Sequence, residues 1–322
     1  MAEPVRVAPF DAHNRALVEN VHPPGWKNPT PRGRYDLVVV GAGSAGLITS
    51  GVAASLGARV ALVERFLLGG DCLNVGCVPS KAVIRAARLA EEARRARRVL
   101  GYGPADDARP GFAAAFERMR AVRARISEAD SAARYRDEFG VEVFLGDGRF
   151  TGPDRLEVGG AELRFRRAVI ATGGRPAAPP IPGLAEADPL DNESVFDLTE
   201  RPARLAVIGA GPIGCELAQA FRRLGSEVHL LERAGQILTR EDRDAAGIVE
   251  AALRRDGVAL VPECGIVRVE REGDVRRLHL RDAQGATRTL EVDRILVGAG
   301  RAPNVEGLGL EAAGVEADPR EG

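Results

Sequence analysis

Asp36-Leu-Val-Val-Val-Gly-Ala-Gly-Ser-Ala-Gly46 is the stretch that decides the fold of this 322-residue chain. A short apolar, β-branched run stops there at a cluster of glycines, as a buried parallel strand does. A helix is expected to follow and to end at Gly57-Ala58, and the residues from Arg59 to Val63 are typical of a second strand. The sequence therefore predicts a strand-helix-strand unit that starts near Tyr35.

The same pattern returns 168 residues later, where Leu205 to Ile208 runs into Gly209-Ala-Gly-Pro-Ile-Gly214. In both copies an acid stands 18 residues beyond the third glycine, Glu64 in the first and Glu232 in the second. A glycine-rich turn alone is weak evidence, but a turn between a strand and a helix, with an acid at this distance, is typical of dinucleotide binding. Two turns without a ligand are the weaker alternative. We predict an α/β fold with two Rossmann-like dinucleotide-binding domains.

Each glycine of such a turn has its own task. The first permits the tight turn, the second lets the backbone approach a pyrophosphate, and the third lets helix and strand pack, while the helix N-terminus adds partial positive charge. The acid is expected to accept hydrogen bonds from ribose hydroxyls. The predicted residues are Gly41, Gly43, Gly46 and Glu64 in the first copy and Gly209, Gly211, Gly214 and Glu232 in the second. A carboxylate at Glu232 repels a ribose 2′-phosphate and favours NAD over NADP, although the adjacent Arg233 weakens this preference.

Two cysteines lie five positions apart in Gly69-Gly-Asp-Cys72-Leu-Asn-Val-Gly-Cys77-Val-Pro-Ser-Lys81, just ahead of a predicted helix. A zinc site needs two further ligands, and the sequence has no second paired group of cysteine or histidine. A disulfide across so small a loop is constrained and therefore more reducible, and a helix N-terminus favours the thiolate. Lys81 lies one helical turn beyond Cys77, on the same face. We interpret Cys72 and Cys77 as a redox pair; two ordinary buried thiols are the alternative.

The chain has no net positive charge with which to attract polyanions, because its 45 basic and 46 acidic side chains give a formal charge of -1. Neither nucleic acid nor an anionic membrane is an expected partner. The arginines between Arg85 and Arg98 alternate with alanine and glutamate, which indicates a solvated helix face rather than a nucleic-acid patch. No run approaches the roughly 20 apolar residues that span a bilayer, and no signal peptide is evident, so the cytoplasm is the expected location.

The remaining sequence predicts an N-terminal extension, two helices and a linker. Residues 1–34 are polar and proline-rich and are expected to lie over the surface, with Trp26 either docked or disordered. Helices are expected over Pro79–Arg98 and Gly111–Phe139. The second helix is predicted to place five apolar side chains on one face, namely Phe112, Phe116, Met119, Val122 and Ile126. The proline-rich segment from Arg175 to Gly183 is the expected crossing between the domains.

Taken together, these motifs closely resemble those of the class I pyridine nucleotide-disulfide oxidoreductases, from about Tyr35 to Gly322. The segments that carry the resemblance are Gly41–Gly46, Glu64, Cys72–Lys81, Ala171-Thr-Gly173, Gly209–Gly214 and Gly300-Arg-Ala-Pro-Asn304. Within the family, the Gly-Gly-Asp-Cys-Leu-Asn sequence and the long proline-rich lead-in look most like the mercuric-reductase-like branch. The resemblance implies a FAD-binding domain at 35–186, an NAD(P)-binding domain at 187–304 inserted into it, and a return segment at 305–322.

The resemblance also implies what these residues do. FAD is expected on the first domain and NAD(P)H on the second, so that electrons pass through the flavin to a disulfide of Cys72 and Cys77 and on to an acceptor. By the family pattern Cys77 contacts the flavin, Cys72 meets the substrate, and Lys81 pairs with Glu216. Further cofactor contacts are expected from Gly70, Thr172, Gly173 and Gly300. Mercuric ion is the expected acceptor, the activity of a dihydrolipoyl dehydrogenase or another disulfide reductase is the alternative, and no resident metal is expected.

After Asn304 the sequence departs from the family pattern. The family continues with an Ala-x-Gly-Asp segment whose aspartate binds the flavin, and with a dimerisation domain that carries a His-Glu pair. This chain ends at Gly322, before either, and its four histidines lie in none of those contexts. We therefore expect a carboxy-terminally truncated member with weak flavin binding and little turnover, without the domain through which the full-length family forms homodimers. A non-catalytic nucleotide-binding fragment is a second alternative.

Overall fold

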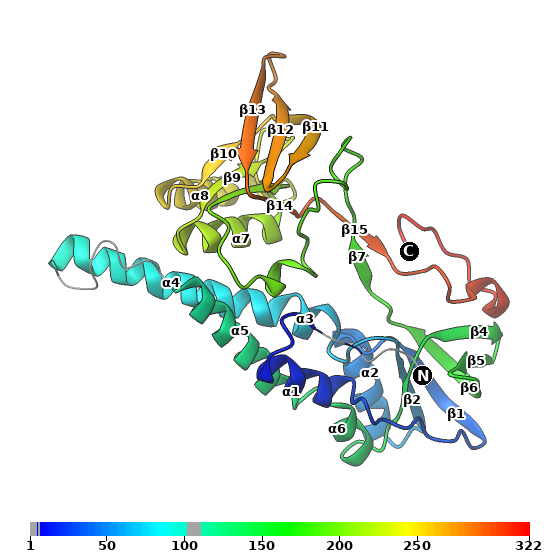
Figure 1. Ribbon diagram of the computed structural model, residues 1–322. Coiled ribbons are helices and arrows are strands. Elements are labelled where there is room, and N and C mark those ends of the chain that lie inside the picture. The colour runs from blue at the N-terminus through cyan, green and yellow to red at the C-terminus, as the bar shows by residue number, and fades with distance from the viewer. Residues whose placement is uncertain (1–4, 6, 102–110) are drawn as a thin grey trace. The chain divides into compact units, whose positions relative to one another are not determined.

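The structure is a computed structural model that describes residues 5, 7–101 and 111–322 (Figure 1). Its contacts divide the chain into two compact units. Unit 1 holds the described residues of 1–79, 120–175 and 301–322, and unit 2 those of 80–119 and 176–300. Residues 80–119 thus group with unit 2, whereas the sequence assigns them to the first domain. The cofactor-domain boundaries at 35–186 and 187–304 stay predictions.

Unit 1 is built on a six-stranded sheet with the order β3-β2-β1-β6-β5-β4. Its strands are β1 (Arg34–Val40), β2 (Val60–Glu64), β3 (Glu142–Leu145), β4 (Gly148–Gly152), β5 (Arg155–Val158) and β6 (Ala161–Ile170). The first four strands of that order run parallel, whereas β6, β5 and β4 pair antiparallel. All five residues of β2 are buried, as expected of an apolar parallel strand covered on both faces.

Two hydrophobic cores lie on the two faces of this sheet. Val38 and Val40 belong to one core and Val39 to the other, since successive side chains of a strand point to opposite faces. The helices of unit 1 include α1 (Ala12–Val21), α2 (Ser44–Ser55), α3 (Gly70–Asn74) and α6 (Ala132–Asp137). Leu47 of α2 and Leu73 of α3 pack in the same core as Val39.

The predicted N-terminal extension does not simply lie over the surface. Residues 12–21 form helix α1, and Leu17, Val18 and Val21 on one of its faces are buried in the core with Val39. Trp26 is docked, with its indole nitrogen donating to the carbonyl of Val143 at 3.1 Å. The prediction was wrong because it rested on overall composition. Three apolar residues at positions i, i+1 and i+4 bury one face of the helix, although most residues around them are polar. Residues 1–4 and 6 of the extension lie outside the described residues.

The helix predicted over Gly111–Phe139 is two helices, α5 (Phe112–Ser127) and α6, which begins after the N-cap Ser131. Its predicted apolar face is correct only in the first half. Phe112, Phe116 and Met119 are buried, but Ile126 is 37% exposed. The buried stripe continues through Arg120 and Arg123, whose hydrogen bonds let charged side chains occupy core-facing positions.

The other predicted long helix, α4 (Cys77–Leu100), starts two residues earlier than expected, with Pro79 in its first turn. Proline is tolerated there because the first backbone amides of a helix have no partner within the helix.

Unit 2 repeats the parallel half of unit 1. Its four parallel strands have the order β10-β9-β8-β14, which corresponds to β3-β2-β1-β6. They are β8 (Arg204–Ile208), β9 (Glu227–Leu231), β10 (Ala259–Val261) and β14 (Arg294–Val297). The unit also contains α7 (Pro212–Arg223), α8 (Arg243–Arg255) and an antiparallel sheet of β11 (Gly265–Glu272), β12 (Val275–Arg281) and β13 (Thr287–Val292). The predicted α/β fold with two dinucleotide-binding-type units is confirmed.

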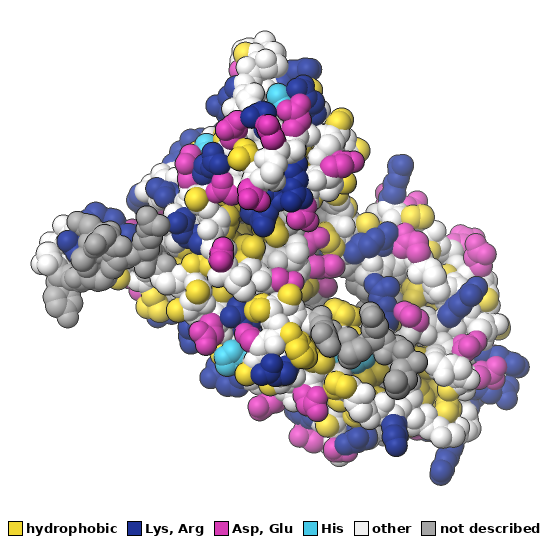
Figure 2. Space-filling model, viewed as in Figure 1, with side chains coloured by type: hydrophobic (Ala, Val, Ile, Leu, Met, Phe, Trp, Pro, Cys, Tyr) yellow, Lys and Arg dark blue, Asp and Glu magenta, His cyan; other side chains and the backbone are white. Residues whose placement is uncertain are grey.

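Basic and acidic side chains are interspersed over the face of the molecule that Figure 2 shows. This distribution agrees with the near-zero formal charge of the sequence. Among the described residues, no helix has the length and apolar character needed to cross a membrane.

Candidate functional site

The first glycine turn connects β1 to α2 and is held together by close backbone contacts. Gly41 has a φ of +99°, and a Cβ placed on it would lie 2.4 Å from the carbonyl oxygen of Ala171. A Cβ on Gly46 would lie 1.8 Å from the carbonyl oxygen of Gly41. Both glycines are therefore required by the chain itself, because no side chain fits at those distances.

The second turn, between β8 and α7, has the same construction. Gly209 has a φ of +96°, and a Cβ on Gly214 would lie 2.0 Å from the carbonyl oxygen of Gly209. Gly211 differs, since no described atom lies within 4 Å of its would-be Cβ. The protein itself does not demand glycine there, which fits the predicted approach of a pyrophosphate to that backbone.

The N-termini of α2 and α7 point at these turns without a side-chain cap. Gly43 and Gly211 are the two N-cap residues, and no described side chain hydrogen-bonds the first amides of either helix. Free amides at a helix N-terminus bind anions, and the helix dipole adds to the attraction. The two turns therefore fit the pyrophosphates of two dinucleotides.

Glu64 and Glu232 each accept a hydrogen bond from a backbone amide of the glycine turn in their own unit. The two carboxylate oxygens of Glu64 accept from the amides of Ala42 at 2.7 Å and Phe66 at 2.8 Å. Glu232 accepts from Ala210 at 2.8 Å and Ala234 at 2.9 Å. Burial raises the pKa of the Glu64 carboxyl, and the hydrogen bonds from Ala42 and Phe66 oppose that rise. Each oxygen retains lone pairs, so the predicted contact with a ribose stays possible and stays a prediction.

The cysteine segment packs directly against the first glycine turn. Gly70 has a φ of +53°, and a Cβ on it would lie 2.6 Å from the Cα of Gly43. Cys72 in α3 is half-buried and Cys77, the first residue of α4, is exposed. This contact joins the predicted redox pair to the predicted dinucleotide turn within one unit.

The two thiols interact with each other. Burial raises the pKa of the Cys72 thiol, a hydrogen bond with Cys77 raises it further, and a hydrogen bond with Ser44 of α2 lowers it. Ser44 thus stabilises the thiolate of Cys72 from the first turn of the dinucleotide helix. The sequence analysis missed Ser44, because only the folded chain brings it to the cysteine.

Gly76, between the cysteines, has a structural task. A Cβ on it would lie 2.7 Å from the carbonyl oxygen of Asp71 and 3.4 Å from the Cα of Cys72. The loop from Cys72 to Cys77 therefore closes on its own backbone, and a side chain at position 76 would push the cysteines apart.

Asn304, which follows β15 (Arg301–Pro303), forms hydrogen bonds with the Ala171-Thr-Gly173 segment. Thr172 donates its hydroxyl to the carbonyl of Asn304 at 2.7 Å, and the Asn304 side chain donates to the carbonyl of Thr172 at 2.9 Å. The Asn304 amide donates to Gly173 at 3.0 Å. The Thr172 hydroxyl is thus committed to the protein backbone, and its predicted cofactor contact, like those of Gly173 and Gly300, is untested.

Arg301 contacts the cysteine segment. Its guanidinium forms an ion pair with Asp71, the residue before Cys72, and donates to the carbonyl of Gly174. No sequence pattern predicts this ion pair, since 230 positions separate the two residues.

Lys81 and Glu216 lie together in unit 2, as the resemblance implies. The Lys81 ammonium contacts both carboxylate oxygens of Glu216 at 2.8 Å. The two side chains are 59% and 38% exposed, so the ion pair contributes little to stability. Their roles in electron transfer remain predictions.

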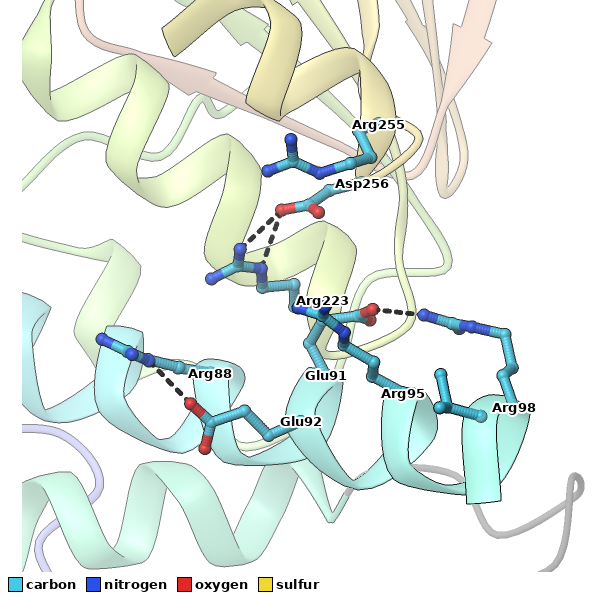
Figure 3. Close-up of a pocket in the computed structure, with 9 residues that line it drawn as sticks. Arg88, Glu91, Glu92, Arg95, Arg98, Arg223, Arg255 and Asp256 are labelled. Atoms are coloured by element: carbon cyan, nitrogen blue, oxygen red, sulfur yellow. Dashed lines mark hydrogen bonds and ion pairs between the residues drawn. The ribbon is translucent and has the colours of Figure 1, made fainter. Parts of the chain in front are cut away.

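A cleft of about 790 Å³ in unit 2 collects arginines from α4, α7 and α8 (Figure 3). The acids that line it are all paired: Glu91 with Arg98, Glu92 with Arg88, and Asp256 with Arg223, at distances of 2.7 to 2.8 Å. Such interspersed pairs are typical of a solvated surface, in agreement with the sequence interpretation of Arg85–Arg98.

Two further cysteines lie outside the redox segment. Cys215 and Cys264 are buried, and burial, followed by the charges of Glu232 and Glu216, raises the pKa of Cys215 to about 12. Such thiols are poor nucleophiles. No group of three or more potential metal ligands occurs among the described residues.

Comparison with known proteins identifies the family. Residues 35–322 match the family described as pyridine nucleotide-disulphide oxidoreductase. The chain belongs to this family. Such oxidoreductases are FAD-dependent and use pyridine nucleotides.

Curated relatives include a mercuric reductase from Bacillus cereus, 36% identical over 89% of this chain and 45% of the relative. A dihydrolipoyl dehydrogenase from Thermus scotoductus is 36% identical over 89% of this chain and 61% of the relative. A solved structure, the HOCl-induced flavoprotein disulfide reductase RclA from Escherichia coli, has a TM-score of 0.76 and 29% identity, over 89% of this chain and 61% of that one. The chain thus spans about half to three fifths of the length of these proteins.

Proposed function

We propose that the chain carries electrons from NAD(P)H, through FAD, to a disulfide of Cys72 and Cys77, and from their thiols to an acceptor. The observation that carries this proposal is the contact between Gly70 and Gly43, which sets the cysteine segment against the first dinucleotide turn. A structural disulfide or a metal site would not need that position. When bound, FAD supplies the two-electron transfer between the reduced nicotinamide and the cysteine pair.

The protein's own residues bind the cofactors and influence the protonation state of the cysteine sulfurs. The amides at the N-termini of α2 and α7 are the proposed pyrophosphate sites, with Glu64 and Glu232 at the riboses. Reduction of the disulfide takes two electrons and two protons and gives two thiols. Burial and Cys77 raise the pKa of Cys72, and the Ser44 hydroxyl offsets part of that rise in favour of the thiolate, which is the form that attacks a disulfide or binds a soft metal ion.

For the acceptor we propose mercuric ion, with lipoamide, the disulfide form of dihydrolipoamide, or another disulfide as the alternative. Several mercuric reductases, 34 to 36% identical to this chain, support the first choice, and dihydrolipoyl dehydrogenases at similar identity support the second. NAD is the proposed nicotinamide, since Glu232 disfavours a 2′-phosphate. The reducing cytoplasm is the proposed compartment, and a homodimer is proposed only for full-length members of the family, through their dimerisation domain.

A thiol count under single-turnover conditions tests the core of this proposal. The oxidised protein is mixed with FAD and one equivalent of NADH without oxygen. The expected result is two new thiols per NADH oxidised, with NADH and one proton consumed, and none in the Cys72→Ala variant. NADH binding without thiol formation in the parent protein would support a nucleotide-binding fragment instead.

The acceptor is tested with the reduced protein. Mercuric ion and lipoamide are each added to the dithiol form, and the release of elemental mercury or of dihydrolipoamide, which must accompany reoxidation of Cys72 and Cys77 to the disulfide, is measured. Reoxidation by lipoamide alone would replace the mercuric proposal with the disulfide one.

A further inference from the structure

Asn74 lies in α3, between the two cysteines of the proposed redox pair, and is only 5% exposed. Its side-chain amide donates to the carbonyls of Leu68 at 3.0 Å and Gly70 at 2.9 Å. Its backbone carbonyl accepts from the guanidinium of Arg123 at 2.6 Å. The segment that carries Cys72 is therefore held from both sides at one residue.

Arg123 links this segment to the N-terminal helix. The guanidinium is 1% exposed, and its second terminal nitrogen donates to the side-chain oxygen of Asn14 in α1 at 2.7 Å. Asn14 is itself fully buried, and its side-chain amide donates to the carbonyl of Pro9 at 2.8 Å. A chain of buried polar contacts thus runs from residues 9–14 through Arg123 to the loop between the cysteines.

A buried arginine at position 123 destabilises the fold relative to an apolar residue unless its guanidinium makes hydrogen bonds that an apolar residue cannot make. Burial of a guanidinium carries a large desolvation penalty, and hydrogen bonds offset it only with good geometry. Position 123 faces the core on a helix whose other buried residues are largely apolar. A leucine would fill the space, but it would leave the Asn74 backbone carbonyl and the Asn14 side-chain oxygen without the Arg123 donor.

We infer that Asn14 and Arg123 are positioning residues for the redox pair, so that the N-terminal helix sets the thiol–disulfide equilibrium of Cys72 and Cys77. The inference rests on the proposed function. When the disulfide forms, one S–S bond replaces two S–H bonds, and two electrons and two protons pass to the oxidant. A fixed loop raises the effective concentration of one sulfur at the other and favours the disulfide.

The equilibrium is measured on the 322-residue protein in mixtures of reduced and oxidised dithiothreitol, by alkylation of the thiols and mass analysis. In Asn14→Ala the guanidinium loses its second partner, and we expect the equilibrium constant for disulfide formation to fall about tenfold, as for the loss of a hydrogen bond to a charged group. Asn20→Ala is the matched control. Asn20 also lies in α1 and donates to Ser127 of α5 at 2.9 Å, but it does not reach Asn74. We expect it to leave the constant within twofold of the parent value.

Two further variants separate positioning from general loosening. Asn14→Asp retains the oxygen that Arg123 contacts and should keep the parent constant within about threefold, even if its thermal unfolding midpoint falls. Arg123→Lys keeps the charge but has no two-pronged donor, and it should lower the constant like Asn14→Ala; it carries the comparison if Asn14→Ala does not fold. Equal constants in the parent, Asn14→Ala and Arg123→Lys, or an equal fall in Asn20→Ala, would overturn the inference. If the parent forms no Cys72–Cys77 disulfide at any ratio, the proposed function itself fails.

Discussion

Glu64 accepts a hydrogen bond from the backbone amide of Ala42, the second residue of the first glycine turn, at 2.7 Å. Glu232 makes the equivalent contact with Ala210 in the second turn at 2.8 Å. The acid that closes each strand-helix-strand unit therefore shapes the pyrophosphate turn as well as standing at the proposed ribose position. Because the two turns lie in separate units, each acid should affect one cofactor.

Substituting one acid at a time tests this separation. In Glu64→Gln the side-chain amide can present its oxygen to only one of the two backbone amides, so one hydrogen bond is lost. We expect FAD affinity to fall about tenfold or more with NADH affinity unchanged, and the reverse in Glu232→Gln. Calorimetric titration with each cofactor provides the measurement. A similar loss of both cofactors in either variant would contradict the separation.

Substitutions in the second glycine turn can show which glycine is needed for folding and which is needed for NADH binding. A Cβ at position 211 meets no described atom within 4 Å, whereas a Cβ at 214 would lie 2.0 Å from the carbonyl oxygen of Gly209. Gly211→Ala should therefore fold with a parent-like thermal midpoint and bind NADH at least tenfold more weakly. Gly214→Ala should lose stability, by roughly 1–3 kcal/mol as for other overpacked sites. Normal NADH binding by Gly211→Ala would remove the pyrophosphate assignment.

The four thiols should react in a fixed order with an alkylating reagent. Cys77 is exposed, Cys72 is half-buried, and Cys215 and Cys264 are buried, so the last two should react only after unfolding. The pKa of Cys72 is raised by burial and by Cys77, so its reaction should become fast only above the usual range of about 8.5. Cys77→Ala removes one of those causes and should move the pH midpoint for Cys72 downward. Peptide mapping after alkylation at several pH values decides this; an unchanged midpoint would mean that the thiols do not interact.

The Lys81–Glu216 ion pair should matter for electron transfer and hardly at all for stability. An exposed pair contributes about 0–1 kcal/mol, so Glu216→Gln should unfold within that range of the parent protein. If the proposed role is correct, NADH-dependent formation of thiols should slow at least tenfold. Glu250→Gln is the matched control, since Glu250 pairs with Arg254 at 2.9 Å in the same unit. Parent-like rates in Glu216→Gln would limit the pair to a surface contact.

Acid should weaken the docking of the N-terminal helix through Asp11. Burial alone would raise the pKa of Asp11, but hydrogen bonds from the Asn14 amide and from Arg120 outweigh it and lower the pKa. A lowered pKa in the folded state means that Asp11 stabilises the fold above its unfolded pKa of about 3.9, and that this contribution is lost as pH falls further.

The lone tryptophan, Trp26, follows α1 and reports this change by fluorescence. The stability difference between the parent protein and Asp11→Asn should be constant above about pH 5 and should vanish at lower pH. A difference that persists below pH 2 would assign the effect to lost packing and not to the charge of Asp11.

Local sequence determined the repeated strand, turn and helix. Gly46 and Gly214 are required by contacts with Gly41 and Gly209, five residues earlier in the chain, so the spacing of the motif carries that part of the geometry with it. Gly41 and Gly209 instead meet Ala171 and Gly298, which the sheet brings close. The closeness of Cys72 and Cys77 was predictable from their spacing of five positions, and their redox role stays a prediction.

Patterns of apolar residues failed where polar groups occupy the core. Arg123 and Asn14 are buried because each satisfies the other, and a periodicity that counts only apolar side chains places the face of α5 wrongly at Ile126. The burial of α1 was not predicted either, because its overall composition is polar. Its Leu17, Val18 and Val21 nevertheless face the core.

The sequence by itself thus determined the two dinucleotide turns, their acids and the cysteine pair, since short-range backbone sterics and spacing define them. Only the tertiary structure decided what stands beside those sulfurs: Ser44, the Asp71–Arg301 ion pair and the Asn14–Arg123–Asn74 chain. These contacts join residues separated by as many as 230 positions, and each depends on how helices and strands pack, which no local pattern encodes.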